Sequence, residues 1–245
     1  GVPMTTSGLA FDADGVAYIS TLVGDIWRVT GLDRGLAAVT WTRYASGISL
    51  PLGLEMVDGV LYVLGEGGIT RLHDYNKDGE ADYYERFTKM AMQLGGRGAE
   101  NQNLERDAAG NFYACGIKGI VRISPDGTKL EVISAGARNP LGLGVRPDGL
   151  ALSDSSEGAP NNGTCTIYES NHPENEKSVS RLKRILYLPR GVDNSPGSRL
   201  FMDDPSFGPL GESIIGTSYG SGRLYHIMRA PNHGTPQAAM MLLPM

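Results

Sequence analysis

Short apolar segments with alternating polar positions recur along the chain, and each is followed by a tight turn that ends in glycine. The first copy spans 11–20, where an Asp-Ala-Asp-Gly turn separates two such segments. Altered copies follow at 56–63, 107–114 and 145–152. Alternation with a period of two is typical of a β-strand that has one buried face. Each copy therefore predicts a strand–turn–strand unit.

The spacing of these turns predicts a repeat architecture. The turn glycines lie 44, 51 and 39 residues apart, at Gly15, Gly59, Gly110 and Gly149. A period of about 40–50 residues is typical of the four-stranded blades of a β-propeller. Each unit continues with a second pair of strand-like segments, and a fifth unit keeps this rhythm from 199 to 243 without the Asp-Gly turn. No segment shows sustained helical periodicity.

We therefore predict an all-β fold: a β-propeller of four-stranded antiparallel blades, with five blades visible in a single domain over residues 1–245. A β-sandwich with coincidental turns is the alternative, but it does not explain why four turns recur at blade spacing. The composition agrees with a turn-rich fold, because the chain contains 34 glycines and 14 prolines without a collagen-like period.

The polar segment 73–85 predicts a calcium site. Counted from Asp74, oxygen-bearing side chains occupy the first, third, fifth, ninth and twelfth positions of a calcium loop, and glycine occupies the sixth. The predicted metal ligands are Asp74, Asn76, Asp78, Glu80 through its carbonyl, Asp82 and Glu85. On the repeat, this loop joins the third and fourth strands of the second blade at its outer rim, so we expect a structural role. A solvated acidic turn is the alternative.

Charge and composition exclude several classes of protein. A net charge of −5 argues against nucleic-acid binding, which requires a basic face. No apolar run is long enough to span a bilayer. Because the chain begins Gly-Val-Pro, we expect either a removed leader or a fragment. Cys115 and Cys165 form either one disulfide or two buried thiols, and without a Cys-x-x-Cys motif neither a zinc ribbon nor an attached haem is expected.

Polar loops at the channel of the predicted propeller form a second candidate site. Loops that enter the innermost strands include 101–103, 138–140 and 190–195. Their Arg and Asn side chains suit an oxygen-rich ligand such as a sugar or an acidic cofactor, although such groups also form purely structural networks. The four histidines fall outside the predicted channel loops, and no nucleophile elbow, P-loop or dinucleotide fingerprint occurs.

One of these loops carries a family resemblance. Residues 135–149 read Ala-Gly-Ala-Arg-Asn-Pro-Leu-Gly-Leu-Gly-Val-Arg-Pro-Asp-Gly and resemble a segment of the soluble quinoprotein glucose and sorbosone dehydrogenases. Further segments extend the resemblance to the propeller region of large exported bacterial proteins, which is often joined to a c-type haem domain: 24–29, 69–79, 188–195, 207–210 and 218–220. These motifs are specific together and weak alone.

The resemblance implies a six-bladed, calcium-dependent propeller that uses pyrroloquinoline quinone (PQQ). It implies cofactor contacts for Arg138 and Asn139, and the channel loop adds Asp193 and Asn194 to the predicted cofactor-binding set. It also implies a periplasmic or extracellular location, and a cytochrome c domain or other subunits as partners. The family's catalytic His is missing, because the corresponding stretch 98–103 contains none.

We therefore expect an exported calcium-binding propeller that resembles PQQ-dependent sugar dehydrogenases and binds a carbohydrate-like or quinone ligand at the channel mouth. The missing base favours an alternative, a non-catalytic scaffold or binding module in a larger assembly. A third reading is a calcium-dependent lactonase-type hydrolase with Glu55, Asn103 and Asp193 as metal ligands.

Overall fold

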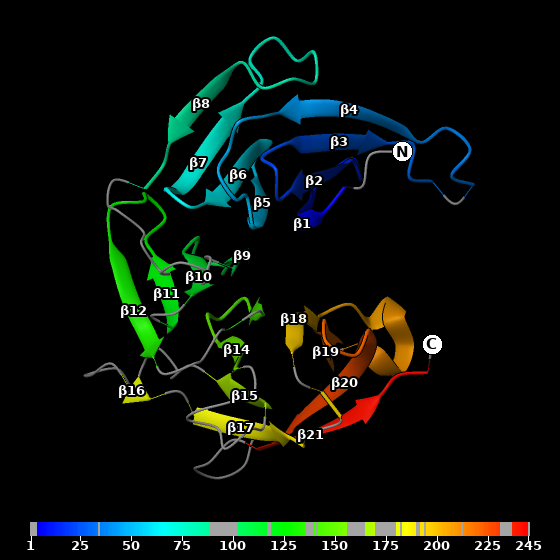
Figure 1. Ribbon diagram of the computed structural model, residues 1–245, viewed down its shortest axis with the longest axis vertical. Coiled ribbons are helices and arrows are strands. Elements are labelled where there is room, and N and C mark those ends of the chain that lie inside the picture. Colours follow the sequence, from blue (N-terminus) through cyan, green and yellow to red (C-terminus); the bar gives the residue numbers. More distant parts are fainter. Residues whose placement is uncertain are drawn as a thin grey trace.

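In the described residues, five small sheets follow one another along an arc, as Figure 1 shows, and they are antiparallel apart from one short edge strand. The computed structural model describes residues 4–33, 35–88, 102–116, 119–135, 140, 142–155, 165–169, 180–181, 183–189, 192–193, 195–211, 213–230 and 237–244. The prediction of an all-β propeller built from four-stranded blades is confirmed.

Blades 1 and 2 are consecutive four-stranded meanders. Blade 1 contains β1 (Thr6–Phe11), β2 (Ala17–Thr21), β3 (Ile26–Thr30) and β4 (Thr40–Ala45). Blade 2 contains β5 (Gly53–Val57), β6 (Val60–Gly65), β7 (Gly68–His73) and β8 (Tyr83–Arg86). In each blade the first strand is innermost and the fourth lies at the rim (Figure 1).

Blades 3 to 5 repeat this order. Blade 3 contains β9 (Gln102–Arg106), β10 (Phe112–Gly116), β11 (Gly119–Ile123) and β12 (Leu130–Ala135), to which β16 (Ser180–Arg181) adds a short parallel edge strand. Blade 4 contains β13 (Leu143–Val145), β14 (Ala151–Ser155), β15 (Cys165–Glu169) and β17 (Lys183–Leu188). Blade 5 contains β18 (Pro196–Met202), β19 (Ser213–Ser218), β20 (Arg223–Ala230) and β21 (Gln237–Leu242), with a 3₁₀ segment, η2 (Pro205–Leu210), between β18 and β19.

The repeated glycine turns join the first and second strands of blades 1 to 4. Their glycines have φ values of 79°, 79°, 87° and 86° at Gly15, Gly59, Gly110 and Gly149. This left-handed conformation is strained for residues with a side chain, which is why glycine recurs there. The edge strand β16 and the η2 segment were not predicted, because both depend on contacts that a strand pattern does not report.

Apolar clusters between successive blades form the core. One cluster joins blades 1 and 2, for example through Ile26, Leu61 and Leu72, which are fully buried. Comparable clusters join blades 2 and 3, blades 3 and 4, and blades 4 and 5. Each blade therefore depends on its neighbour to bury one apolar face.

The two end blades keep an apolar face exposed. Ala10 packs toward blade 2, so the alternation of β1 turns Leu9 and Phe11 to the opposite face, where they are 56% and 54% exposed. Phe201 packs toward blade 4, and its neighbour Leu200 on β18 is 58% exposed on the other face. In Figure 1 the strands β1 and β18 border the opening of the arc between blades 1 and 5.

Glycine allows the innermost strands to approach one another. A Cβ atom on Gly53 of β5 would lie 2.5 Å from the backbone nitrogen of Leu104 on β9 and 2.7 Å from the carbonyl carbon of Asn103. Backbone atoms cannot move away as a flexible side chain can. The close contact of blades 2 and 3 at the channel therefore requires glycine at this position.

We predict that Gly53→Ala destabilises the protein by about 1–3 kcal/mol, since the added methyl group overpacks the contact between β5 and β9. Urea unfolding would measure the change. The matched control is Gly67→Ala in the β6–β7 turn, where a Cβ would meet no atom within 4 Å. Equal unfolding midpoints for the two variants would contradict the prediction.

Candidate functional site

A cavity of about 590 Å³ lies among the innermost strands of blades 1, 2, 3 and 5. Its lining includes the two carboxylates Glu55 on β5 and Glu105 on β9, and the guanidinium-bearing Arg199 on β18. Ser7, Asn103 and Ser198 add hydroxyl and amide groups. The volume falls within the range of about 300–1,000 Å³ that is typical of small-molecule sites.

Asn103 connects two blades across this cavity. Its Nδ2 donates to Ser198 Oγ over 2.9 Å, which joins β9 of blade 3 to β18 of blade 5. Asn103 has a φ of 54°, a left-handed conformation that Asn adopts more readily than most residues. The local backbone turn thus carries the amide of Asn103 to the inner strand of blade 5.

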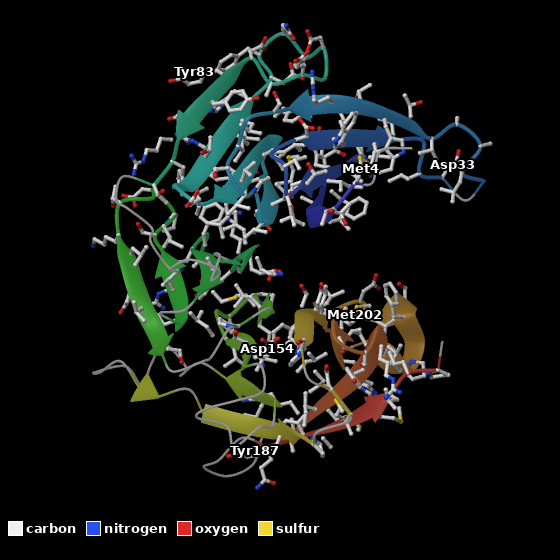
Figure 2. All side chains as sticks on the ribbon, viewed as in Figure 1. Met4, Asp33, Tyr83, Asp154, Tyr187 and Met202 are labelled. Atoms are coloured by element: carbon white, nitrogen blue, oxygen red, sulfur yellow. The ribbon has the colours of Figure 1, made fainter. Side chains whose placement is uncertain are left out.

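Arg199 is a buried residue of the cavity lining. Its guanidinium donates to the carbonyl oxygens of Ser198 at 3.0 Å and Thr217 at 3.2 Å, and also to that of Gly197. Its Nη2 lies 3.6 Å from Oδ2 of Asp154, and both side chains are almost completely buried. Figure 2 shows Asp154 on the part of blade 4 that faces the centre of the arc. A buried ion pair of this kind needs both partners, because either charge alone would be poorly solvated.

The two cavity carboxylates hold protons unusually strongly. Burial raises the pKa of Glu55 to about 7, against the opposing positive charge of Arg106. Burial also raises the pKa of Glu105 to about 8, and the negative charge of Glu55 adds to this rise. Groups with pKa values near neutrality can accept or donate a proton at physiological pH. The cavity thus has acid–base capacity without a histidine among its lining residues.

The structure brings together only part of the predicted channel set. Arg138, Asn139 and Asn194 lie outside the described residues. Asp193 is buried, and its Oδ1 accepts hydrogen bonds from the backbone of Ser195 at 3.0 Å and from the hydroxyl of Ser218 at 2.7 Å. Within the described residues its buried Oδ2 has no hydrogen-bond partner. The role of these four residues in cofactor binding stays a prediction.

Sequence reasoning missed several residues of the cavity. Glu105, Ser198 and Arg199 were not predicted, Glu55 was named only for the lactonase reading, and Asn103 was predicted within the channel loop 101–103. The available signal was a charged residue within an otherwise apolar strand, as in Leu-Glu-Met-Val at 54–57. A carboxylate in an apolar strand must point toward water or other polar groups. The innermost strand of a propeller offers such surroundings, because it lines the central cavity.

The predicted calcium loop forms a compact turn at the rim of blade 2, between β7 and β8. Oδ2 of Asp82 accepts the backbone N–H groups of Tyr75 and Asn76 at 2.7 and 3.2 Å. Nδ2 of Asn76 donates to Asp78 Oδ2 at 3.0 Å and to Asp82 Oδ1 at 3.2 Å. A positively polarised amide group thus bridges two carboxylates, which shows that negative charge converges there.

The first and last predicted ligands of the loop behave differently. Asp74 accepts the N–H of Gly79 through Oδ2 at 2.9 Å, whereas its buried Oδ1 has no hydrogen-bond partner within the described residues. Glu85 lies on β8 and binds His73 Nε2 at 2.8 Å and the Arg71 guanidinium. Within the described residues, no three carboxylate, imidazole or thiol side chains converge on one point. Any calcium shell here must also use amide and carbonyl oxygens.

The loop also fastens blade 2 to blade 1. The backbone N–H of Ala81 donates to the carbonyl of Tyr44 at 2.8 Å, and the Ala81 side chain packs against the apolar cluster between the two blades. The Cα of Gly79 faces Arg28 of β3, whose side chain a Cβ atom there would contact at 3.7 Å. The expected position of the loop on the blade, between its third and fourth strands, is confirmed.

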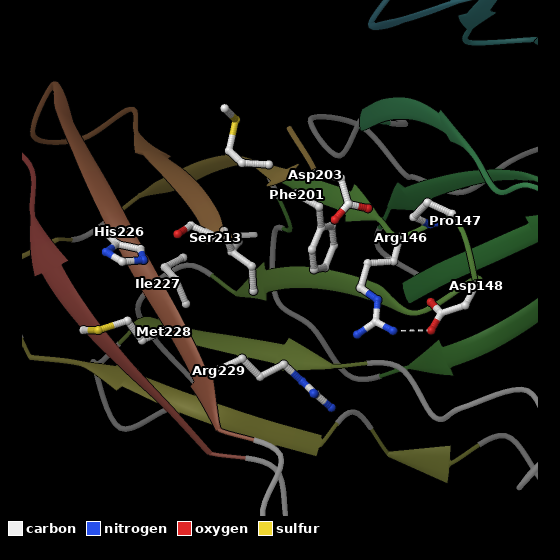
Figure 3. A pocket seen from close by; sticks show the side chains of 12 residues that line it. Arg146, Pro147, Asp148, Phe201, Asp203, Ser213, His226, Ile227, Met228 and Arg229 are labelled. Carbon is white, nitrogen blue, oxygen red and sulfur yellow. Dashed lines mark hydrogen bonds and ion pairs between the residues drawn. The ribbon is translucent and has the colours of Figure 1, made fainter. Parts of the chain in front are cut away.

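A second cavity, of about 700 Å³, lies between the β13–β14 turn of blade 4 and the strands of blade 5. Figure 3 shows Phe201 in its interior, and Arg146 paired with Asp148. Ile214 and Ile227 add apolar surface. None of the predicted site residues lines this cavity, and its charged pair is exposed, so the channel is the better candidate for chemistry.

Comparison with known proteins identifies the fold. No family model and no curated protein sequence matches the chain. Among solved structures, a putative glucose dehydrogenase from Thermus thermophilus matches with a TM-score of 0.68 and 17% identity, over 99% of this chain and 85% of that chain. PQQ-bound aldose sugar dehydrogenase from Streptomyces coelicolor matches with a TM-score of 0.67 and 16% identity, over 97% and 81%.

A calcium-binding protein of a different kind is also similar. Regucalcin from Agrobacterium tumefaciens matches with a TM-score of 0.64 and 12% identity, over 96% of this chain and 74% of that chain. The resemblance to sugar-dehydrogenase propellers is thus confirmed at the level of the fold. Because propellers with different activities share this fold, the likeness does not assign the chemistry.

We predict that stability falls as the pH rises from about 4.5 to about 8. In this window the folded protein holds protons on Glu55 and Glu105 that the unfolded chain releases, so the slope of unfolding free energy against pH is negative. Glu55→Gln or Glu105→Gln removes part of the slope and stabilises the protein at pH 8 by about 1–3 kcal/mol.

Denaturant unfolding at several pH values measures this effect. The matched control is Glu66→Gln in the exposed β6–β7 turn. The interpretation of the cavity carboxylates is wrong if all three variants keep the same dependence of stability on pH as the parent protein.

Proposed function

We propose that this protein is an exported, calcium-binding propeller that resembles the PQQ-dependent sugar dehydrogenases. Its channel would bind a carbohydrate-like ligand. The observation that carries the proposal is the inner-strand cavity, which combines Glu55, Glu105, Asn103 and Ser198. Hydroxyl groups of a sugar both donate and accept hydrogen bonds, and these side chains offer partners of both kinds.

Glu55 is the group that we assign to proton transfer. With a pKa raised by burial to about 7, it is partly ionised at neutral pH and can accept a proton from a ligand hydroxyl. It would thereby supply the base that stretch 98–103 lacks. Arg199 is held by backbone carbonyls and by Asp154, so it would fix the inner strand of blade 5 rather than take part in proton transfer.

The described lining suits a neutral ligand better than an anionic one. PQQ carries carboxylate groups, whereas the cavity presents two glutamates and one guanidinium that is already engaged by backbone carbonyls. The predicted cofactor contacts Arg138 and Asn139 lie outside the described residues. The quinone is therefore proposed on the resemblance alone, and we derive no reaction step through it.

Calcium is proposed for the loop 74–82. The curled backbone, the convergence of Asp78 and Asp82 on Asn76, and the unsatisfied oxygen of Asp74 all support a cation there. Asp82 closes the loop from the ninth position. We assign Glu85 to its ion pair with Arg71 and His73. A bound ion would neutralise the loop carboxylates and so stabilise the contact between blades 1 and 2.

Location and partners follow from the resemblance. We propose a periplasmic or extracellular protein that works with a cytochrome c domain or other subunits. In the described residues, no helix is long and apolar enough to cross a membrane. A non-catalytic binding module remains the alternative, and absence of any redox cofactor from the purified native protein would favour it.

We predict that removing calcium with EGTA lowers the melting temperature by roughly 5 °C or more when the reference sample contains calcium well above its dissociation constant. Asp78→Ala abolishes this calcium-dependent shift, because it removes one of the two carboxylates bridged by Asn76. The control Asp14→Ala changes an exposed acidic turn in blade 1 and keeps the shift. If neither EGTA nor added calcium changes the melting temperature, the metal assignment is wrong.

For the channel, we predict that protein incubated with PQQ and calcium reduces an artificial dye when an aldose is added. Glu55→Gln lowers kcat at least tenfold with a smaller effect on KM, since it removes the proton acceptor and leaves the cavity shape. Glu66→Gln serves as the surface control. Failure to bind PQQ at all would exclude the oxidoreductase reading while leaving sugar binding open to calorimetry.

The second candidate, a calcium-dependent lactonase, is favoured by one observation: Glu55 and Asn103 both line the cavity. It requires calcium in the channel with Asp193 as a third ligand. Calcium-dependent lactone hydrolysis that survives Asp78→Ala but not Glu55→Gln would support it.

A further inference from the structure

Three aromatic rings gather beside the calcium loop, and the two tyrosines among them are exposed. The cluster consists of His73 at the end of β7, Tyr75 in the loop and Tyr83 at the start of β8. His73 and Tyr83 are directly paired across the two strands. Tyr75 and Tyr83 are 67% and 51% exposed. Figure 2 shows Tyr83 at the outer rim of blade 2, far from the channel.

The three rings lie side by side rather than in a single stacked column. Their centroids are 5.3 Å apart for His73 and Tyr75, 6.0 Å for His73 and Tyr83, and 6.4 Å for Tyr75 and Tyr83, with interplanar angles of 12°, 32° and 23°. In a single column the outer two rings would be about twice as far apart as neighbours. The three rings are therefore mutually adjacent, and two of the three pairs are close to parallel.

Other aromatic pairs in the protein serve the core. Tyr18 and Tyr44 meet edge to face between blades 1 and 2, and Tyr62 packs on Phe87 and Phe112 between blades 2 and 3. In the rim cluster, by contrast, the rings of Tyr75 and Tyr83 are exposed to solvent. A single exposed tyrosine is ordinary, but a cluster of exposed rings marks a binding surface more often than chance.

The chemistry around the cluster restricts its ligand. Glu85 binds the edge of His73 at 2.8 Å, the carboxylates of Asp78 and Asp82 lie on the adjoining loop, and the whole chain carries a net charge of −5. The net negative charge of the chain disfavours nucleic acids and acidic polymers. Three side chains are also far fewer than the roughly 20–30 residues that each side of a standard protein interface contributes.

The ring orientation decides between the remaining ligands. A cage for an organic cation needs rings that face a common centre, whereas these rings are nearly parallel. A flat, electron-rich face with polar groups at its edge matches a pyranose ring, whose C–H face is weakly positive and whose hydroxyl rim seeks hydrogen bonds. Such a ring can stack on Tyr75 and Tyr83 while its hydroxyls reach the tyrosine hydroxyls and the loop.

We propose that His73, Tyr75 and Tyr83 form a second binding site, separate from the channel, on which the sugar rings of a neutral polysaccharide stack. The loop orients Tyr75, because the N–H of this residue is held by Asp82 at 2.7 Å. The site does not depend on the proposed channel chemistry. It would hold the protein on a polymeric carbohydrate while the channel remains open to small molecules.

Affinity electrophoresis in native gels tests the proposal. The gels contain soluble neutral polysaccharides in turn, namely hydroxyethylcellulose, galactomannan or amylopectin, and anionic polygalacturonate as a contrast. The parent protein is retarded by at least one neutral polymer and not by polygalacturonate. Tyr75→Ala and Tyr83→Ala each weaken the retardation about tenfold, the magnitude expected for one lost stacking partner. Tyr83→Phe retains most of it.

Controls separate stacking from other effects. Tyr219→Ala removes a tyrosine that is 85% exposed on blade 5, and Glu55→Gln alters the channel, so both keep the retardation. Thermal unfolding of each variant verifies that the fold persists. The proposal is overturned if no neutral polymer retards the parent protein, if Tyr219→Ala loses as much as Tyr83→Ala, or if the cluster instead mediates self-association that Tyr83→Ala abolishes.

Discussion

The packing of each blade's apolar face against the next blade is the interaction on which the rest of the structure depends. A four-stranded sheet alone cannot bury both of its faces. Apolar clusters between successive blades supply that burial at four junctions. The same requirement explains the exposed Leu9, Phe11 and Leu200, which lie on faces where the series of junctions ends. The arc and the channel both follow from this stacking.

Stacking also creates the electrostatic character of the channel. The inner strands come close, which Gly53 permits, and the carboxylates on β5 and β9 are thereby partly withdrawn from water. Desolvation penalises the charged form, so the pKa values of Glu55 and Glu105 rise toward neutrality. Desolvation of the two carboxylates lowers the stability of the fold at high pH. A binding site that uses a proton acceptor near neutral pH is one reason for a protein to retain such carboxylates.

The sequence was informative where a local backbone requirement repeats, and less so where the fold decides which groups meet. Glycine turns at blade spacing predicted the propeller because a left-handed turn needs glycine at every copy. The loop pattern predicted a curled acidic turn for the same reason. Glu105 and Arg199 could not be placed, because residues 94 positions apart meet only when blades 3 and 5 approach the same cavity.

Glu85 shows how strand register can compete with a motif. The pattern predicts it as the twelfth ligand of the loop, but β8 has already begun at Tyr83, and its register sets Glu85 opposite Arg71. The Arg71 guanidinium therefore forms an ion pair with the Glu85 carboxylate. The same register sets Tyr83 opposite His73 and leaves its ring at the surface. The short loop thus fixes three things together: a tight turn closed by hydrogen bonds to Asp82, a contact with blade 1 through Ala81, and an aromatic surface at the rim.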